Sequence, residues 1–521
     1  MADVFIGGVA QTVFGKDSRL LEDLLADVGD KAIKTSSSQP DIVLIGNYNY
    51  QGYAGQASLD TLVGNKLKLP TTTGIFHINR GSSTGAAVVE LAYALVKGGK
   101  KVLVVSGEIM YNEKSHDRDL VKRETSKVIA EEDRAMGLDM PLIAALAATE
   151  YGIRHKIPEE EMRCLFFSIL YQNRENGSLN PAAYFKDLPS DQEYFFDTNK
   201  NPFVARPLTK SDCAGTYNGA AAVFLTPNQT DLKLLDICGA RSSVTIADRR
   251  TLISLDATVD SAILLFKTNK LNPTDIDIVE LHDAFPPVPI LAAEDLGIAQ
   301  RGKGAELVRN GINKKGRHVH YNLSGGFLCK THPIGASGTA QLVELSMQMR
   351  GQNQYKDMLK GEFRNLRYGL WFSMNGFGFY NDVGVVENMN STRMKSDFDP
   401  SELPTRYSPK GSLLDHYIPS GKRSKIMGAV PFLSADGKYN GLGIATTPNG
   451  LRLGYISGDH ADALGRRTEI IQNGGAPELI ILPELTEQIG SIVSAYMERL
   501  GPLGPKARLY RERFKAMFNI K

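Results

Sequence analysis

A short stretch decides the fold, and it reads His77-Ile78-Asn79-Arg80-Gly81-Ser82-Ser83-Thr84-Gly85. The residues before it predict a strand at Thr73–Ile78, and its glycine and hydroxyl residues predict a tight turn. From Gly85 to Val96 nearly every residue is small or apolar, which predicts a helix buried on all sides. Such a unit presents a side chain at a helix N-terminus, where peptide dipoles favour negative charge. Ser82 lies in this turn, just before the helix.

The second half of the chain repeats this unit. Residues Asp275–Leu281 alternate as a strand does and end at His282. A second turn, His332-Pro333-Ile334-Gly335-Ala336-Ser337-Gly338, leads into an apolar helix at Thr339–Leu345. Strands that alternate with helices predict an α/β protein, and the repeat predicts that its core is a duplicated unit.

The composition limits the classes of function. The 521 residues are 42% hydrophobic and carry a formal net charge of +2, so we expect several domains and no nucleic-acid partner. The 4 cysteines lie far apart and form no CxxC pair, which predicts a reduced, cytoplasmic protein without a thiolate metal site. No stretch reaches the roughly 18–20 apolar residues that a membrane span needs.

The chain divides into four segments. Residues 1–235 form the first half of the core and include a charged, aromatic-rich lobe at about 110–210, which we expect to be mostly helical. Residues 236–388 form the second half. Residues 389–422 lack periodicity and predict a linker, and residues 423–521 contain short strand patterns that predict a small β-rich C-terminal domain.

A series of motifs in residues 3–388 resembles the thiolase superfamily. They are Asn79–Gly85 (nucleophile motif), Met136–Met140 (start of the loop domain), Gly219–Val223 (strand closing the first half), His282–Phe285 (HDCF type), Lys330–Gly338 (GHPxGxSG) and Met374–Gly378 (CxGGG or HNxG). The histidine at position 282 is similar to that of sterol-carrier-type thiolases, which are acetyl-CoA acetyltransferase-like. The resemblance implies a duplicated five-layered αβαβα fold, a helical loop domain over a CoA site, and a homodimer paired through Thr73–Ile78.

The resemblance also implies a site. Ser82 stands where the family has its nucleophilic cysteine, and His332 stands where the family has the histidine that activates it. The backbone N–H groups of Ser82 and Gly376 match one family oxyanion hole, and His282 with His332 would form the other. The implied substrate is CoA or an acyl-CoA, with no permanently bound cofactor and no metal. The residues that hold CoA are not identified by the motifs.

Two departures from the family pattern matter for the chemistry. Ser82 replaces the cysteine, and Met374 replaces the second Cys or His, which moves protons in the condensation step. A serine hydroxyl needs a hydrogen-bonded base during attack, and a methionine cannot transfer a proton. We therefore expect a thiolase-like, acyl-CoA-dependent acyltransferase of lipid metabolism with an altered or degenerate active site. The alternative is a non-catalytic acyl-CoA-binding or scaffolding protein.

Each candidate also has a structural interpretation. Ser82 is equally a small packing residue, His282 a satisfied histidine at a strand end, and His332 a turn residue. A hydrogen bond between Ser82 and His332 would favour chemistry, whereas a Ser82 hydroxyl turned into the core would favour binding alone. His318 and His320 share one face of a strand, but no third metal ligand is evident.

Two further alternatives concern the C-terminal residues. An oligonucleotide-binding fold is one, although the weak aromatic and basic content argues against it. A monomer is the other, with the added residues covering the strand edge that a homodimer would otherwise pair.

Overall fold

The computed structural model of the chain describes residues 2–111, 118–135, 138–187, 191–246, 249, 251–311, 319–360 and 365–407, together with the backbone of three strands between 425 and 458. Several predictions lie outside the described residues: those on Met136-Gly137, on His318, on linker residues 408–422 and on the C-terminal domain apart from these strands. Within the described part of the chain, no helix is long and apolar enough to span a membrane.

The first half of the core contributes five strands to a 10-stranded sheet. They are β1 (Phe5–Gln11), β2 (Ile42–Gly46), β3 (Gly74–Ile78), β4 (Val102–Glu108) and β7 (Gly219–Thr226). Their order is β3-β2-β4-β7-β1, in which β2 is parallel to β3 and β4, and β7 is antiparallel to β4 and β1. The predicted strand before the Ser82 turn is β3, which lies at the edge of the sheet.

The second half repeats this topology. Its strands are β8 (Leu232–Arg241), β9 (Ile276–Glu280), β10 (His320–Tyr321), β11 (Tyr368–Asn375) and β12 (Tyr380–Asn388), in the order β10-β9-β11-β12-β8. Strand β9 is parallel to β10 and β11, and β12 is antiparallel to β11 and β8. The halves meet where Phe5 of β1 pairs with Lys233 of β8. The order and the directions match those of the first half, which confirms the predicted duplication.

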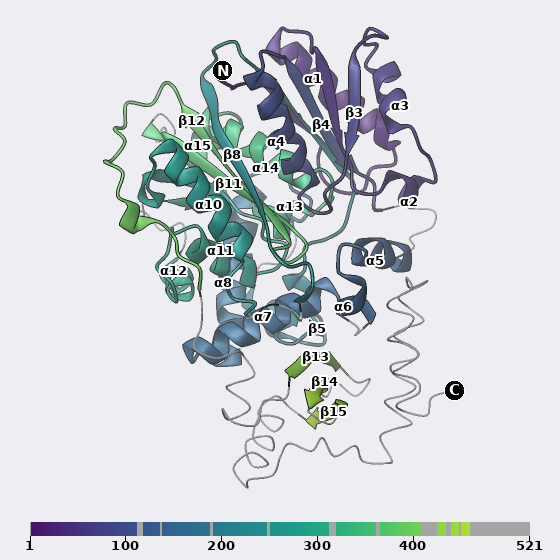
Figure 1. Cartoon of the computed structure of the whole chain (residues 1–521), viewed down its shortest axis with the longest axis vertical. Helices are drawn as coiled ribbons and strands as arrows, with labels where there is room; N and C mark the ends of the chain where they lie inside the picture. Colours follow the sequence, from purple (N-terminus) through teal and green to yellow (C-terminus); the bar gives the residue numbers. More distant parts are fainter. Residues whose placement is uncertain are drawn as a thin grey trace.

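Helices form the other layers (Figure 1). Helix α1 (Leu21–Ser36) covers one face of the first-half strands, and α10 (Asp256–Asn269) covers β8 and β12. Helices α4 (Thr84–Lys97) and α14 (Ser337–Met349) lie together between the two halves and contact strands of both. This is the predicted five-layered αβαβα arrangement. Helix α4 is the predicted helix, but it is not buried on all sides, because Leu91 is 42% exposed. Helix α14 is its counterpart in the repeat.

The two central helices approach each other closely near their N-termini. A Cβ on Gly85 would lie 2.5 Å from the backbone nitrogen of Thr339, and a Cβ on Gly338 would lie 2.6 Å from that of Ala86. Only glycine permits this approach, because neither backbone nitrogen can move without shifting its helix. Around the crossing, apolar side chains of both helices join Leu44, Val104 and Trp371 in one buried cluster.

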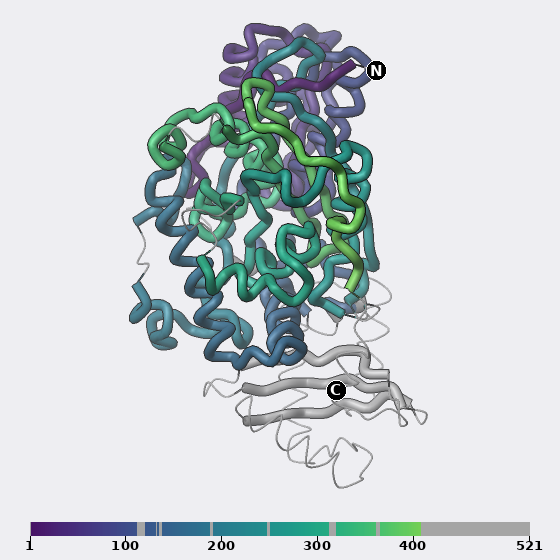
Figure 2. The backbone as a smooth tube through the Cα atoms, turned by 90° about the vertical axis from the view of Figure 1, so that its left-hand side faces the viewer, coloured from purple at the N-terminus to yellow at the C-terminus, as the bar shows by residue number. Residues whose placement is uncertain are grey.

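Residues between β4 and β7 form a mostly helical lobe, seen in blue below the two halves in Figure 1 and at the lower left in Figure 2. Its elements are α5 (Arg118–Ser126), α6 (Glu131–Ala135), α7 (Met140–His155), α8 (Glu159–Ser178), α9 (Gln192–Phe196), β5 (Phe203–Ala205), β6 (Leu208–Thr209) and the 3-10 helix η1 (Lys210–Asp212). Helices α7 and α8 pack into one apolar cluster with the second-half core.

Shorter elements complete the core. They are α2 (Tyr50–Ala54), α3 (Leu59–Lys66), α11 (Pro287–Asp295), α12 (Gly304–Arg309), α13 (Gly326–Lys330), α15 (Tyr355–Met358), η3 (Pro273–Asp275) and η5 (Pro400–Glu402). After the core, β13 (Lys425–Leu433), β14 (Tyr439–Thr447) and β15 (Gly450–Gly458) form a separate antiparallel sheet in the order β13-β14-β15.

Candidate active site

The four predicted site residues come from both halves of the core. Ser82 lies in the turn between β3 and α4, and Gly376 directly follows β11. His282 follows β9, and His332 lies between α13 and α14. The Gly376 backbone N–H donates to Ser82 Oγ over 3.0 Å, and the imidazole centroids of His282 and His332 are 5.0 Å apart. The fold therefore brings the four residues into two contacting pairs.

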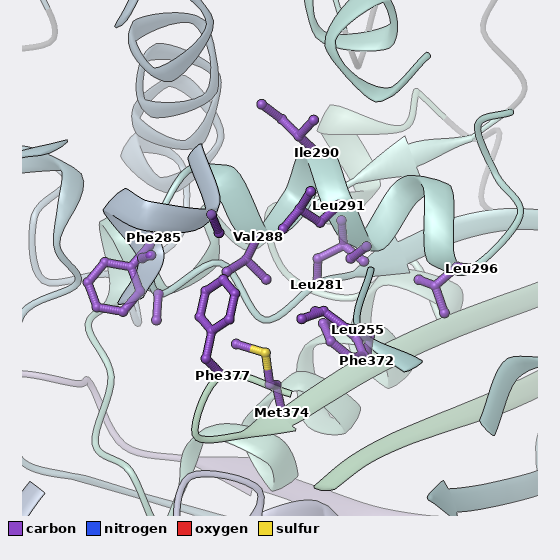
Figure 3. Packing of buried hydrophobic residues seen from close by; sticks show 14 of the residues in the cluster. Leu255, Leu281, Phe285, Val288, Ile290, Leu291, Leu296, Phe372, Met374 and Phe377 are labelled. Carbon is purple, nitrogen blue, oxygen red and sulfur yellow. The ribbon is translucent and has the colours of Figure 1, made fainter. Parts of the chain in front are cut away.

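Met374 links the two pairs. Its backbone N–H donates to Nδ1 of His282 over 3.3 Å, and its carbonyl accepts the Ser82 hydroxyl over 2.9 Å. Its side chain is buried and does not reach out of the protein. Figure 3 shows it beside Phe377 in an apolar cluster that includes Leu255 and Val288. The thioether is thus a packing group, at the position where the family pattern has a proton-transferring residue.

The Ser82 hydroxyl is held by backbone groups. It donates its single proton to the Met374 carbonyl and accepts the Gly376 N–H. No imidazole of the described residues hydrogen-bonds it. Ser82 is 8% exposed, and its backbone N–H donates to Oδ1 of Asn375 over 3.2 Å. Both N–H groups of the predicted oxyanion hole therefore already have acceptors within the chain.

The turn around Ser82 needs the residues that flank it. Gly81 has φ 55°, and a Cβ there would lie 2.0 Å from Oδ1 of Asn375. Arg80 fixes the turn to the second half, because its guanidinium binds Asp382 and Glu90, each over 2.8 Å. Both distances fit charge-assisted hydrogen bonds.

The two histidines lie in an aromatic, dehydrated environment. The Phe327 ring stacks on His332 with centroids 4.7 Å apart and meets His282 edge-on at 4.8 Å. Burial lowers the pKa of His332 to about 3. Burial, followed by the neighbouring His332, holds the pKa of His282 well below its ordinary value. Both rings are therefore neutral at neutral pH.

The hydrogen bonds of the two rings assign different roles to them. The Ser337 hydroxyl donates to the Pro333 carbonyl over 2.9 Å, so its contact of 2.7 Å with His332 uses a proton on Nδ1 of the imidazole. A neutral His332 with its proton on Nδ1 has an unprotonated Nε2, which can accept a proton. His282 accepts a backbone N–H at Nδ1 and so carries its proton on Nε2, as a donor. The pair thus offers one base and one hydrogen-bond donor.

Two buried carboxyl groups support these histidines, and sequence reasoning did not single them out. Asp283 accepts the Phe327 N–H over 2.6 Å and the Asn173 amide over 2.5 Å, which ties helix α8 of the lobe to the histidine loop. Glu108 accepts N–H groups of Tyr48 and Gly335 over 2.8 and 3.2 Å. Burial raises the pKa of each carboxyl to about 7. In the sequence, Asp283 is indicated by its position beside His282. Glu108 is indicated only by its position at the end of a strand.

The lobe also touches the nucleophile turn. Val128, which follows α5, comes within 3.3 Å of the position that a Cβ on Gly81 would take. Val128 also packs in a small apolar cluster with Ile334 and Met110. One lobe residue therefore lies close to the Gly81 turn and packs against the cluster that contains Ile334 of the second turn.

Comparisons with known proteins agree with this architecture. Residues 239–385 match the family described as "Thiolase C-terminal domain-like". The chain is 30% identical over 367 residues to an acetyl-CoA acetyltransferase of Methanothermobacter thermautotrophicus, which covers 68% of this chain and 92% of that protein. It is 28% identical over 380 residues to sterol carrier protein 2 of Rattus norvegicus, covering 67% of this chain and 66% of the relative.

A solved structure extends the likeness of the fold. The monomeric SCP2-thiolase-like protein type 1 of Mycobacterium smegmatis superposes with a TM-score of 0.62 at 13% identity, over 92% of this chain and 96% of that one. The duplicated topology, the order of the motifs and the archaeal relative lead to one conclusion. The chain belongs to the thiolase family of acyl-CoA acyltransferases.

Proposed function

We propose that the protein binds a CoA thioester between the Ser82 turn and the His282–His332 pair, and acts on it without rapid acylation of Ser82. The observation that carries this proposal is the bonding of the Ser82 hydroxyl, which donates to the Met374 carbonyl and accepts the Gly376 N–H. A serine becomes a nucleophile when a base accepts its proton. A backbone carbonyl is too weak a base for that role.

The histidines supply the chemistry in this proposal. His332 acts as the general base through Nε2. It takes a proton from the attacking group, which is water or another acyl acceptor, as that group adds to the thioester carbonyl. His282 donates its Nε2 proton in a hydrogen bond to the carbonyl oxygen as negative charge develops there. The thiolate of CoA is then the leaving group. At a pKa of about 3, His332 is unprotonated throughout the neutral range but is a weak base, so this role requires its pKa to rise when the thioester is bound.

The test compares three proteins with butyryl-CoA: wild type, Ser82→Ala and His332→Ala. Calorimetry measures binding, a thiol reagent measures free CoA, and intact-protein mass spectrometry detects an acyl adduct. We expect all three to bind, no adduct on wild type, and CoA release that survives Ser82→Ala but falls at least about a hundredfold with His332→Ala. An acyl adduct on wild type that disappears in Ser82→Ala would contradict the proposal.

A non-catalytic acyl-CoA-binding or scaffolding protein is the second candidate. It is favoured by one observation, that the Ser82 and Gly376 N–H groups are bonded within the chain and so are not free to stabilise an oxyanion. The same experiment separates the two functions. Binding of butyryl-CoA with no release of CoA above background would establish the second.

The remaining features of the proposal follow the family and the composition. We propose CoA or an acyl-CoA as the substrate, no permanently bound cofactor, a role in lipid metabolism and a cytoplasmic location, which the scattered cysteines support. We also propose the predicted domain limits, with the lobe at about 110–210 covering the site and a separate C-terminal domain from residue 423.

We propose a homodimer paired through β3. This strand lies at the edge of the sheet, and Phe76 on it is 55% exposed, so its backbone and an aromatic ring are free to pair. Light scattering at micromolar concentration should give about twice the chain mass of 57.0 kDa. Phe76→Lys should weaken the dimer, with Lys68→Ala as a surface control. A wild-type mass near that of one chain would contradict the dimer.

A further inference from the structure

Arg174 on helix α8 is a buried cation without an anion beside it. The residue is 6% exposed, and no carboxylate of the described residues pairs with its guanidinium. Its one hydrogen bond to the described residues runs from Nη1 to the Phe185 carbonyl, at a long 3.4 Å. Nε is buried without a partner among them. A buried charge that lacks a counter-charge destabilises the fold, so its presence needs a reason.

A second buried arginine shows the usual arrangement. The side chain of Arg154 on α7 is 4% exposed, and its Nε donates to the Glu150 carboxylate over 2.7 Å. In Arg174 the corresponding edge of the guanidinium, made by Nε and Nη2, has no partner among the described residues. Such a two-donor edge binds both oxygens of a carboxylate side by side. Arg174 therefore offers a preformed acceptor site for an anion.

Aromatic rings lie beside this guanidinium. The Phe185 ring centroid is 5.5 Å from its central carbon, a contact that attracts the cation but offers no acceptor to its N–H groups. Phe185 meets Tyr184 at 5.0 Å and Tyr217 at 5.7 Å, and Tyr217 stacks on Tyr111 at 5.6 Å. These four residues, the aromatic cluster, are only half-buried. Their rings can therefore still pack against an apolar or aromatic ligand.

The aromatic cluster contacts the segment that carries His332. A Cβ on Gly215 would lie 2.8 Å from the Tyr217 ring and 2.9 Å from the Phe185 ring, and the Gly215 carbonyl accepts the His332 N–H over 2.8 Å. The Phe185 N–H donates to the carbonyl of Cys329, three residues before His332, over 2.9 Å. The unpaired cation is thus a neighbour of the candidate active site and is not used by it.

We infer that Arg174 and the aromatic cluster form a binding site for a carboxylate carried on an apolar or aromatic body. A carboxylate fits better than a phosphate, because its single negative charge matches the single buried positive charge. The carboxylate belongs either to the distal end of an acyl group bound as its CoA thioester or to a separate carboxylic acid. The first source rests on the proposed function, whereas the site itself does not.

The first test uses calorimetry with phenylacetate and its uncharged counterpart phenylacetamide. Wild type should prefer phenylacetate, and Arg174→Met should bind it at least about tenfold more weakly. Arg174→Lys keeps the charge but loses the two-donor edge, so its affinity should fall between the two. Without ligand, the melting temperature of Arg174→Met should equal or exceed that of wild type, because an unpaired buried cation is removed.

Arg154→Met is the matched control. It breaks a buried ion pair, so its melting temperature should fall by several degrees while its affinity for phenylacetate stays that of wild type. A similar fall in Arg174→Met, with unchanged binding of the probes, would show that the Arg174 guanidinium is only structural. If Arg174→Met does not fold, Arg174→Gln makes the same comparison.

Adipoyl-CoA and hexanoyl-CoA, whose acyl chains are equally long, distinguish the two sources. If the acyl group supplies the carboxylate, wild type should bind adipoyl-CoA more tightly, and Arg174→Met should lose that difference. A preference confined to phenylacetate would identify a separate carboxylic acid. A wild type with neither preference, or an Arg174→Met variant that keeps them, would overturn the inference. Binding of butyryl-CoA, which Arg174→Met should leave unchanged, reports on the proposed function independently.

Discussion

The turn before α4 and the turn before α14 occupy equivalent places in the two halves, yet their functional side chains are in opposite states. In the first half, the Ser82 hydroxyl is bonded on both sides by backbone groups. In the second half, His332 hydrogen-bonds Ser337 through Nδ1, and the described residues give its other ring nitrogen no partner. A duplicated unit therefore fixes where a side chain is presented. Its hydrogen-bond partners decide whether that side chain can react.

The carboxyl groups near the two turns extend this contrast. Glu108 bonds N–H groups from both halves, including that of Gly335 in the second turn. Asp283 bonds the lobe and α13 and so holds the Phe327 ring that stacks on His332. The histidine turn is thus braced from several elements, whereas the hydroxyl of Ser82 is held by the single segment Met374–Gly376 at the end of β11.

The largest expected effect concerns the contact that joins the two turns. Gly338→Ala should destabilise the protein by about 2–4 kcal/mol, because the added Cβ would lie 2.6 Å from the Ala86 nitrogen. Urea denaturation measures the change in the free energy of unfolding. Gly98→Ala, beyond the other end of α4, is the control and should change it much less. An equally small effect at Gly338 would mean that the two helices do not meet as described.

The next prediction restores reactivity to the first turn. Ser82→Cys should accept an acyl group from a CoA thioester on the order of a hundredfold faster than wild type, since a thiol near a helix N-terminus gains thiolate character. Intact-protein mass spectrometry detects the adduct, with Ser82→Ala as the background for the 4 native cysteines. Full condensation should still require replacement of Met374 by Cys or His. A Ser82→Cys protein that never acylates would show that the turn is not a thiolase-type pocket.

The third prediction tests the second turn through pH. Burial lowers the pKa of His332 to about 3, from the ordinary value of 6.5. Between these pH values the unfolded chain binds more protons, so this residue destabilises the fold as pH falls from 6.5, by about 1.4 kcal/mol per pH unit. The buried carboxyls of Asp283 and Glu108, with pKa values raised to about 7, act in the opposite direction.

A variant separates these contributions. The unfolding free energy of wild type minus that of His332→Gln should fall as pH is lowered from 6.5 toward 4. Both proteins keep the carboxyls, so the contribution of these groups cancels in the difference. Urea titrations at several pH values measure it. A difference that does not change with pH would mean that His332 is not held neutral by burial.

By itself, the sequence determined the architecture of the core. The run of small residues after Gly85 and its counterpart after Gly338 predicted two buried helices, and the alternating strands predicted the duplicated α/β unit, because periodicity and glycine placement act locally. The motif order then selected Ser82, His282, His332 and Gly376.

Only the tertiary structure decided how those four residues are partnered. Nothing local to Ser82 reveals that its proton goes to the carbonyl of Met374, which is 292 positions away in the chain. The neutral state of His332 likewise depends on burial between α13 and α14, and the bracing by Asp283 and Glu108 depends on N–H groups from distant segments. Hydrogen-bond partners and dehydration are properties of the packed molecule, and a linear pattern carries them only where the partners are neighbours in sequence.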